Sequence, residues 1–263
     1  MPESPRAATI AAAWSVAREA ASRAGVEVRE LQSSEIAIAQ EVIGAVWGPQ
    51  QIPQSNLLRA FAHAGSTLLG ARAGDRPVGA TVGFLGWKGG LHLHSHMTAV
   101  IPTRLSGGVG YALKLWQRAV CLREGIGEIR WTYDPLVARN AQFNLVKLGA
   151  VVMAMHPNFY GAMDDIVNAG EESDRFEVSW RLNSPRVLAA IGGYPLRPTD
   201  VVRSHAIPPD YTTLSRTNPG AARAARTAAR DAVLAAERDG LSIEWEGGAY
   251  RFTRTSDPRA SDG

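Results

Sequence analysis

The chain of 263 residues is 45% hydrophobic and 20% charged, a composition that predicts a water-soluble globular protein with a sizeable core. Its 28 basic and 25 acidic residues leave a net charge of +3 without any block of five like charges, so we expect no nucleic-acid partner. No stretch reaches the roughly 18 consecutive apolar residues of a membrane span, so we expect no membrane partner either. The single cysteine, Cys121, excludes an intrachain disulfide and is typical of a reducing compartment, which predicts a cytoplasmic location.

The first hundred residues are predicted to form helices and an antiparallel sheet. An alanine-rich segment at residues 7–23 is expected to be an amphipathic helix rather than a targeting segment, because charged residues continue its helical pattern. Ser33 is expected to cap a helix that runs to about Trp47, and another helix is expected at residues 55–63. Alternating residues predict strands at 26–31, 66–72, 77–87 and 91–101, with a hairpin turn at residues 73–75.

The second half of the chain is predicted to alternate strands and helices as far as residue 183, after which the sequence becomes rich in proline. Helices are predicted at 110–124 and 138–148, and strands at 128–133, 151–155 and 176–182; the β-α-β-α-β order indicates that part of the sheet is parallel. The segment after Asn183 contains many prolines, and we predict one helix in it, at 221–238. A hairpin of residues 242–245 and 250–253 is predicted to follow. We therefore divide the chain into an N-terminal helix (1–25), a main domain (26–183) and a C-terminal extension (184–263).

A glycine-rich turn joins the strand at 91–101 directly to the helix at 110–124. Gly107, Gly108 and Gly110 allow the backbone to turn tightly and to come close to a ligand. The free N–H groups at the start of the helix carry about half a unit of positive charge from the helix dipole. This arrangement predicts a binding site for an anion, such as the phosphate of a cofactor.

The strand, turn and helix resemble the cofactor-binding motif V-x-P-x-x-[R/Q]-x-x-G-x-G of the GNAT acetyltransferase superfamily. Val100, Pro102, Gly108 and Gly110 fit this motif, and the later helix with Asn140 and its ending K-x-G (Lys147 to Gly149) is similar to another part of the family pattern. The resemblance is to a branch of bacterial predicted acetyltransferases. It implies an α/β (α+β) fold, with a GNAT-like mixed, largely antiparallel sheet flanked by helices and a C-terminal helix and hairpin extension.

The resemblance also implies acetyl-CoA as co-substrate. In this family the pantetheine arm lies where the strand before the glycines splays from the next strand, here between residues 91–101 and 128–133. The pyrophosphate lies on backbone N–H groups of the turn, and an Asn on the later helix reaches the arm. The residues that the resemblance assigns to cofactor binding are Thr98, Ala99, Val100, Ile101, Leu105, Ser106, Gly107, Gly108, Val109, Gly110 and Asn140.

Two positions depart from the family pattern. Leu105 stands where Arg or Gln is usual, although Arg104 is adjacent. A lost charged contact is worth roughly 1.5–3 kcal/mol, so we expect weaker cofactor binding that depends mainly on backbone N–H groups. Leu145 occupies the position at which many members place a tyrosine that protonates the leaving thiolate.

His94 and His96 are the candidates for a general base, because an imidazole with a pKa near 6.5 suits neutral pH and their strand lines the predicted wedge. The alternative is that these histidines, which alternate with His92 along one face, only bond to cross-strand neighbours. We expect no metal site, because alternating residues on one strand stand roughly 7 Å apart and supply at most two ligands.

Four residues are candidates for binding the acceptor. Tyr133 and Asp134 follow the next strand and would either hold an ammonium group or cap the following helix. Tyr160 and Asp164 belong either to a substrate-binding loop or to an ordinary surface loop. The repeated Arg223, Arg226 and Arg230 indicate a solvated helix face, or a contact to the 3′-phosphate of CoA or to an acidic partner.

The function predicted from these features is acyl-CoA-dependent N-acyltransfer, most simply of acetyl, to a small-molecule amine by direct attack on the thioester. A protein lysine remains an alternative acceptor, and a homodimer is compatible with the sequence. Two other hypotheses stay open. One is a degenerate CoA-binding or ligand-binding protein without transferase activity, and the other is a GNAT fold used for different chemistry in a specialised biosynthetic pathway.

Overall fold

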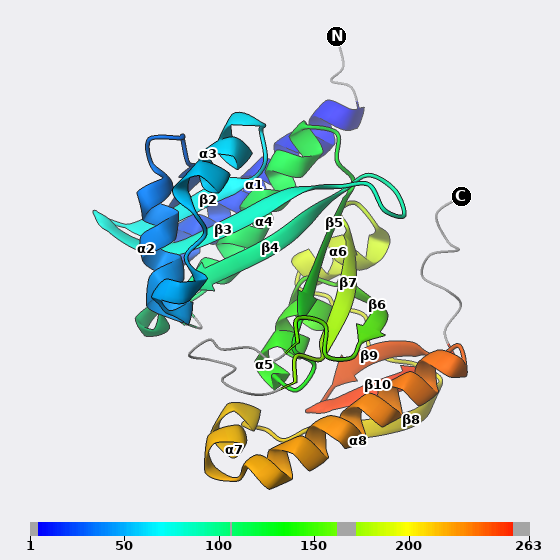
Figure 1. The fold of residues 1–263 in the computed structure, drawn as a ribbon. Coiled ribbons are helices and arrows are strands. Elements are labelled where there is room, and N and C mark those ends of the chain that lie inside the picture. The colour runs from blue at the N-terminus through cyan, green and yellow to red at the C-terminus, as the bar shows by residue number, and fades with distance from the viewer. Residues whose placement is uncertain (1–4, 106, 162–171, 255–263) are drawn as a thin grey trace. The chain divides into compact units, whose positions relative to one another are not determined.

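The computed structural model describes residues 5–105, 107–161 and 172–254 (Figure 1). The chain forms two compact units, Met1–Ile129 and Arg130–Gly263, which we take in turn. Helices flank strands whose assigned pairings are antiparallel in both units. The prediction of a mixed α/β fold with a largely antiparallel sheet is confirmed. None of the helices in these ranges is long and apolar enough to cross a membrane.

The first unit contains four strands in the order β1-β2-β3-β4. Their bounds are Glu27–Glu30, Leu68–Ala73, Arg76–Gly86 and His92–Val100, close to the predicted ranges. The predicted hairpin between β2 and β3 turns at Gly74, whose φ of 58° lies in the left-handed region that favours glycine.

Two pairs of helices cover the two faces of this sheet (Figure 1). On one face α1 (Pro5–Arg23) packs along α4 (Val109–Arg123), and Trp14 meets Trp116 edge to face with ring centroids 5.2 Å apart. The alanines along one side of α1 are buried, and their small side chains allow α1 to pack closely against α4. On the other face lie α2 (Ile36–Trp47) and α3 (Ser55–His63).

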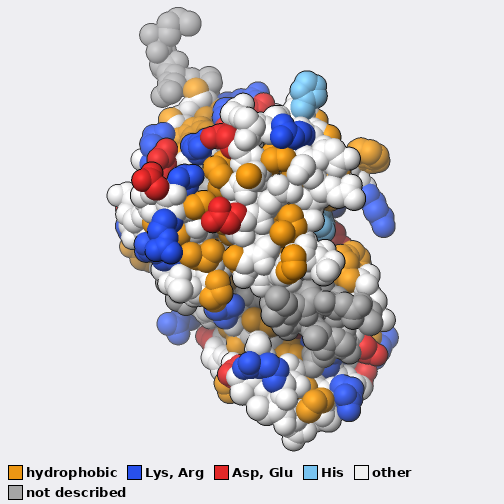
Figure 2. Space-filling view, turned by 60° about the vertical axis from the view of Figure 1, so that its left-hand side comes forward, with side chains coloured by type: hydrophobic (Ala, Val, Ile, Leu, Met, Phe, Trp, Pro, Cys, Tyr) orange, Lys and Arg blue, Asp and Glu red, His pale blue; other side chains and the backbone are white. Residues whose placement is uncertain are grey.

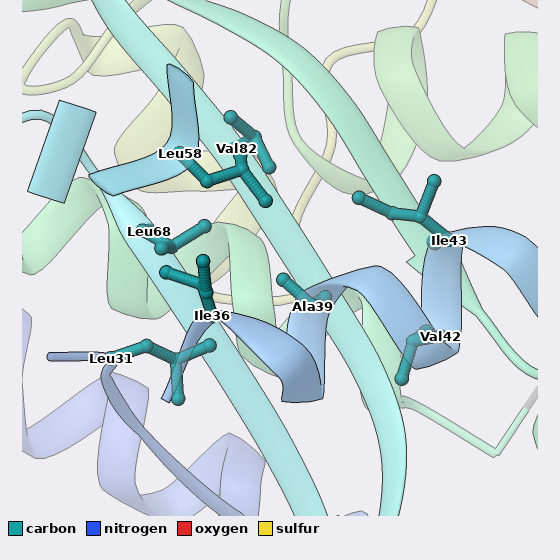
Figure 3. Close-up of a cluster of buried hydrophobic side chains, with 10 residues drawn as sticks. Leu31, Ile36, Ala39, Val42, Ile43, Leu58, Leu68 and Val82 are labelled. Carbon is teal, nitrogen blue, oxygen red and sulfur yellow. The ribbon is translucent and has the colours of Figure 1, made fainter. Parts of the chain in front are cut away.

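The core of the first unit lies beneath α2 and α3. Figure 3 shows side chains of α2, Leu31 and Leu58 directed at Leu68 of β2 and Val82 of β3. Burial of each such side chain contributes about 1.5–3 kcal/mol, so this cluster holds the helices to the sheet. The buried members are Leu31, Ile36, Ala39, Val42, Ile43, Leu58, Leu68, Ala80, Val82 and Ala99.

The predicted cap of α2 is wrong. The helix begins at Ile36 with Glu35, not Ser33, at the capping position. The Glu35 carboxylate accepts a bond from the Gln32 N–H (3.0 Å) and pairs with Arg29 (Nη1 to Oε2, 2.6 Å), which lowers the pKa of Glu35 to about 2. The Glu35 side chain makes no capping bond to the first turn of α2, so the helix begins without the side-chain cap expected from Ser33.

Strand β4 contains an extra residue, His96. Met97 lies opposite Val82 and Ser95 opposite Gly83, so one step on β3 corresponds to two on β4. Met97 packs with the core beneath α2, whereas Ser95 bonds to Lys114 of α4 on the opposite face. The regular strand predicted for residues 91–101 is thus interrupted by a β-bulge that changes the direction of the side chains along it.

A polar network is buried beneath this bulge. Lys114 Nζ donates to Ser95 Oγ (2.7 Å) and lies 3.5 Å from Gln117 Oε1, and Gln117 Nε2 donates to Thr67 Oγ1 (2.9 Å). A Cβ on Gly83 would stand 2.6 Å from Thr67 Oγ1, so the glycine leaves room for this network. Burial lowers the pKa of Lys114 to about 7.

The second unit contains β5 (Glu128–Tyr133), β7 (Arg175–Arg181) and β6 (Val151–His156), in that order. The helix predicted at 138–148 is a short α-helix, α5 (Ala138–Ala141), continued by a π-helix at Gln142–Lys147. Trp131 Nε1 donates to Asn144 Oδ1 (3.2 Å) and Trp180 Nε1 to the Leu148 carbonyl (2.7 Å), so two tryptophans anchor this wider turn to the sheet.

The C-terminal extension is richer in structure than predicted. The helix and hairpin are present, but the proline-rich stretch adds two helices and a strand, and β8 pairs with β10 to make a sheet in the order β8-β10-β9. Ser184, which accepts a bond from the Val187 N–H, and Pro185 start the first added helix, a capping pattern that the sequence contains. The elements are α6 (Pro185–Ile191), β8 (Val201–Ala206), α7 (Tyr211–Thr217), α8 (Pro219–Arg238), β9 (Ser242–Glu246) and β10 (Ala249–Thr253).

Buried ion pairs join α8 to the ends of β5 and β7. Arg226 reaches Asp134 (Nη2 to Oδ2, 2.9 Å), and Arg230 reaches Asp174 with two bonds of 2.8 and 2.9 Å. The Tyr250 hydroxyl adds a bond of 2.6 Å to the Pro135 carbonyl. The solvated helix face and the cofactor contact considered for these arginines are therefore wrong for Arg226 and Arg230, because carboxylates of the same unit engage them.

The surface agrees with the small net charge. On the face drawn in Figure 2, basic and acidic side chains of the described residues are interspersed, with apolar side chains between them. On this face neither sign of charge is gathered on one element.

Replacing Arg226 by Met should lower the free energy of unfolding by about 3 kcal/mol, because the buried Asp134 carboxylate loses its principal cation. Equilibrium urea denaturation measures this loss. Arg223→Met on the same helix is the control; its side chain is exposed and the substitution should change stability little. Adding Asp134→Asn to Arg226→Met should restore part of the loss. Equal effects of the Arg226 and Arg223 variants would contradict the prediction.

Replacing Lys114 by Met should raise the free energy of unfolding near pH 6 by about 1–4 kcal/mol, because a buried ammonium is removed. The pKa of Lys114 falls from 10.5 in the unfolded chain to about 7 in the fold, so the unfolded chain binds more protons between these values and the wild type gains stability as pH rises through that window. The advantage of Lys114→Met should therefore shrink from pH 7 to pH 10. Denaturation curves across this range test it; exposed Lys147→Met is the control, and a pH-independent advantage would contradict it.

Candidate functional site

The structure confirms the strand, glycine turn and helix expected from the motif. β4 ends at Val100, and the Ile101 N–H donates to the Val78 carbonyl (3.0 Å). A single 3-10 turn, Pro102–Arg104, follows, and Gly108 adopts φ 85° and ψ −6° immediately before α4. The left-handed conformation of Gly108 is what turns the chain from the loop into the helix.

The N-terminus of α4 is arranged to receive an anion. Gly108 is the capping residue, and it has no side chain with which to bond the first helical N–H groups. The first bond within the helix is from the Ala112 N–H to the Gly108 carbonyl (2.9 Å), so the N–H groups of residues 109–111 precede the helical ladder. Gly107 and Gly108 are exposed, and so is the basic side chain of Arg104. Backbone dipoles and one cation therefore face solvent here.

The remaining turn residues contribute backbone rather than side chains. Leu105 is 44% exposed and presents no charged group, and the Val109 side chain is buried. A Cβ on Gly110 would lie 3.6 Å from Val100 Cγ2, so Gly110 faces the strand and not the turn. Ser106 lies outside the described residues.

The segment predicted to bind pantetheine, Thr98 to Ile101, is paired along one edge with β3. Thr98, Ala99 and Val100 lie opposite Thr81, Ala80 and Gly79, so β3 occupies one edge of β4. Thr98 Oγ1 and Thr81 Oγ1 are 2.8 Å apart, which fixes the strand from the α4 side. The predicted opening beside residues 128–133 involves both compact units and stays a prediction.

His94 and His96 belong to an aromatic cluster on the α3 side of the sheet. Both imidazoles pack against Phe84 of β3, with centroids 5.2 and 5.9 Å away, and Phe84 stacks on Phe61 of α3. Desolvation lowers the pKa of His96, so its imidazole is neutral at neutral pH. His92 has a structural contact instead, with its Nδ1 2.7 Å from the Gly90 carbonyl oxygen.

Tyr133 and Asp134 are both enclosed in the second unit. The Tyr133 hydroxyl is buried without a hydrogen-bond partner among the described residues, and burial raises its pKa. The Asp134 carboxylate accepts from the Leu136 N–H (2.8 Å), pairs with Arg226 and lies 3.6 Å from Arg175. These contacts are those of the structural alternative, in which Asp134 organises the turn after β5.

Tyr160 lies near the end of β5, whereas the other candidates of the second unit have different surroundings. The hydroxyl of Tyr160 is 3.1 Å from Thr132 Oγ1, and its exposed ring lies beneath the Arg175 guanidinium. Asn140 is half-buried on α5. Leu145 is only 2% exposed, so an apolar core side chain fills the position of the family's tyrosine. Asp164 lies outside the described residues.

Sequence reasoning missed the polar network of Lys114, Ser95, Gln117 and Thr67. Lys114, Gln117 and Arg118 are three and four residues apart on a helix whose other buried residues are apolar, and this pattern is the signal that would have found the network. No group of three His, Cys, Asp or Glu side chains within the described ranges is placed to hold a metal ion.

No protein-family model matches this sequence, and no curated protein matches it. Solved structures are similar to it in fold. One is the ribosomal-protein-S18-alanine N-acetyltransferase of Escherichia coli, with 12% identity, a TM-score of 0.49 and coverage of 60% of this chain and 95% of that protein. A GNAT-family acetyltransferase of Streptococcus pneumoniae has 12% identity, a TM-score of 0.48 and coverage of 59% and 97%. Arabidopsis thaliana Naa50, solved with the bisubstrate analogue CoA-Ac-MVNAL, has 17% identity, a TM-score of 0.45 and coverage of 59% and 97%.

Proposed function

We propose that this chain is a GNAT-type N-acyltransferase that uses acyl-CoA, most simply acetyl-CoA, and a small-molecule amine. The observation that carries the proposal is the turn between β4 and α4. Val100, Pro102, Gly108 and Gly110 have the spacing of the family motif, and the left-handed Gly108 stands directly before the exposed helix N-terminus. We assign transfer to residues 26–183, support of the β5–β7–β6 sheet to residues 184–263, and a cytoplasmic location to the protein.

The turn supplies what a pyrophosphate requires. The pyrophosphate is proposed to lie on backbone N–H groups of residues 105–110, attracted by the α4 dipole and by the positive charge of Arg104 beside Leu105. The N–H groups of Leu105 and Gly107 already donate to the Pro102 and Arg104 carbonyls (3.3 and 3.2 Å), so the N–H groups at the start of α4 carry most of this proposal. From there the pantetheine arm would follow the backbone of residues 98–101, and Asn140 is proposed to reach the arm from α5. Because Leu105 contributes no charge, affinity rests mainly on the backbone.

The reaction needs few side chains. An ammonium acceptor first loses a proton, and the neutral amine nitrogen then attacks the thioester carbonyl carbon. The adduct gives its extra N–H proton to the base, the C–S bond breaks, and CoA leaves as thiolate, which can take up that proton. His96, neutral at neutral pH and beside His94, is the proposed base. A thiol pKa of about 8.5 makes the thiolate a good leaving group, so Leu145 in place of a tyrosine is compatible with turnover.

The surroundings of the imidazoles support a compact acceptor. Phe84 packs against both imidazoles and Phe61 stacks on Phe84, an apolar surrounding that suits an amine on a small apolar or aromatic body. Tyr133, Asp134, Tyr160 and Asp164 remain proposed acceptor contacts, of which Tyr160 is exposed. A protein N-terminus or lysine is the competing acceptor class, and an amine panel that includes a peptide separates them.

A second candidate function is CoA binding without transfer. Leu105 and the buried Leu145 favour it, because both family positions that would carry polar groups are apolar. The two functions differ in thiol release, which only a transferase catalyses.

Acetyl-CoA should bind the wild type in calorimetric titration, and Gly108→Ala should weaken binding about tenfold. An alanine in the left-handed region costs about 1–2 kcal/mol, which the turn relieves by moving its N–H groups away from the anion. Gly74→Ala carries the same backbone strain in the β2–β3 turn and is the control; it should lose stability but keep its affinity. Absence of acetyl-CoA binding by the wild type at millimolar concentration would sink the proposed function.

His96→Ala should lower thiol release from acetyl-CoA about 100-fold with tyramine, histamine or spermidine as acceptor, because the base is lost. The affinity for CoA should change little, and exposed His63→Ala is the control. Because desolvation lowers the pKa of His96, the part of the pH dependence of turnover that His96 causes should lie below the ordinary imidazole range, and His96→Ala should remove it. Unchanged turnover of both His96→Ala and His94→Ala would return the histidines to a packing role. Binding without thiol release by the wild type would favour the second candidate.

A further inference from the structure

The side chains of Thr67, Ser95, Lys114 and Gln117 form a buried polar network beneath the β4 bulge, although packing alone would not require polar groups there. Its members lie between α4 and the sheet, where an apolar side chain of the volume of methionine would also fill the space. A buried amine at this place is unfavourable for stability, so its presence indicates another role. The four side chains and their exposed fractions are Thr67 3%, Ser95 4%, Lys114 3% and Gln117 0%.

The bond from Lys114 to Ser95 acts at the start of the bulge. Ser95 is the last β4 residue before the extra His96, and it lies opposite Gly83 of β3. Gly83 is fixed in turn, because its N–H donates to the Thr67 carbonyl (2.8 Å). A strand that slips by one residue sends all its side chains to the opposite face. Holding Ser95 toward α4 therefore keeps His94 and His96 on the opposite face, against Phe84.

The bulge is also where the reactive end of the cofactor falls, if the proposed function is correct. The pyrophosphate site begins after Ile101, and the proposed arm runs back along residues 98–101 toward the middle of β4. The next residues in that direction are Met97 and His96. The acyl group would thus lie beside the part of the strand that Lys114 and Ser95 hold.

We propose that Lys114 is a positioning residue for acyl transfer: through Ser95 it fixes the bulge at His96, and so the direction from which the His96 imidazole and the β4 backbone approach the thioester. This inference rests on the proposed function. Lys114 itself is enclosed, so we place it behind the strand and not in contact with the cofactor. Loss of the Lys114 amine should therefore lower the rate of the catalytic step and leave the affinity of the β4–α4 turn for CoA unchanged.

The test compares Lys114→Met and Ser95→Ala in the full chain. Calorimetry measures CoA affinity, carbon NMR of acetyl-CoA labelled at the carbonyl reports the environment of the bound thioester, and thiol release gives kcat and KM. Both variants should keep CoA affinity within about twofold, move the bound carbonyl resonance toward that of free acetyl-CoA, and lower kcat about tenfold or more. The double variant should be no worse than either single one, because the two residues act through one bond.

Val120→Ala, which truncates a buried side chain on the same helix, is the matched control. It should lower stability and leave the carbonyl resonance and kcat unchanged, which separates positioning from general loosening of α4. If acetyl-CoA binds the wild type but Lys114→Met and Ser95→Ala keep the wild-type resonance and kcat, the positioning role is overturned while the proposed function stands. If the wild type does not bind acetyl-CoA, both fall.

Discussion

The bulge in β4 determines how the first unit is organised. Before it, Ser95 faces α4; after it, Met97 and Ala99 face α2, and the change of phase takes place at one extra residue, His96. Without it the sheet would carry either the serine or the methionine on the wrong face. The buried network around Lys114, the histidine cluster with Phe84 and the α2 core all depend on this one irregularity.

The two units use buried charge in different ways. In the second unit Arg226 and Arg230 meet Asp134 and Asp174, and these pairs fix α8 to the ends of β5 and β7. In the first, Lys114 donates to the oxygens of Ser95 and Gln117, and burial brings its pKa to about 7. Removing one partner of such a buried pair is costly, because the other charge stays buried. Lys114 lies beneath the bulge, which connects this buried amine with the proposed site.

The proposed chemistry depends on backbone more than on side chains. The left-handed Gly108 and the helix behind it present N–H groups, whereas Leu105 and Leu145 take positions that carry polar groups in the family. Acyl transfer from a thioester can proceed without a side-chain acid, because the leaving thiolate is already stable. What remains to be supplied is a neutral amine in the right place, and His96 beside Phe84 is the arrangement on which the proposal relies.

The sequence by itself determined the elements whose causes are local. The strands of the first unit, helix α4 and the glycine turn followed from period and from residues such as Pro102 and Gly108 that restrict the backbone. Only the tertiary structure decided the bulge at His96, the pairing of Arg226 with Asp134 and the pairing of Glu35 with Arg29 before α2. Each depends on a partner distant in the chain or on another element: Gly83 on β3, a carboxylate 92 residues away, and Arg29 on β1. Periodicity describes one segment at a time, whereas these features exist only where two segments meet.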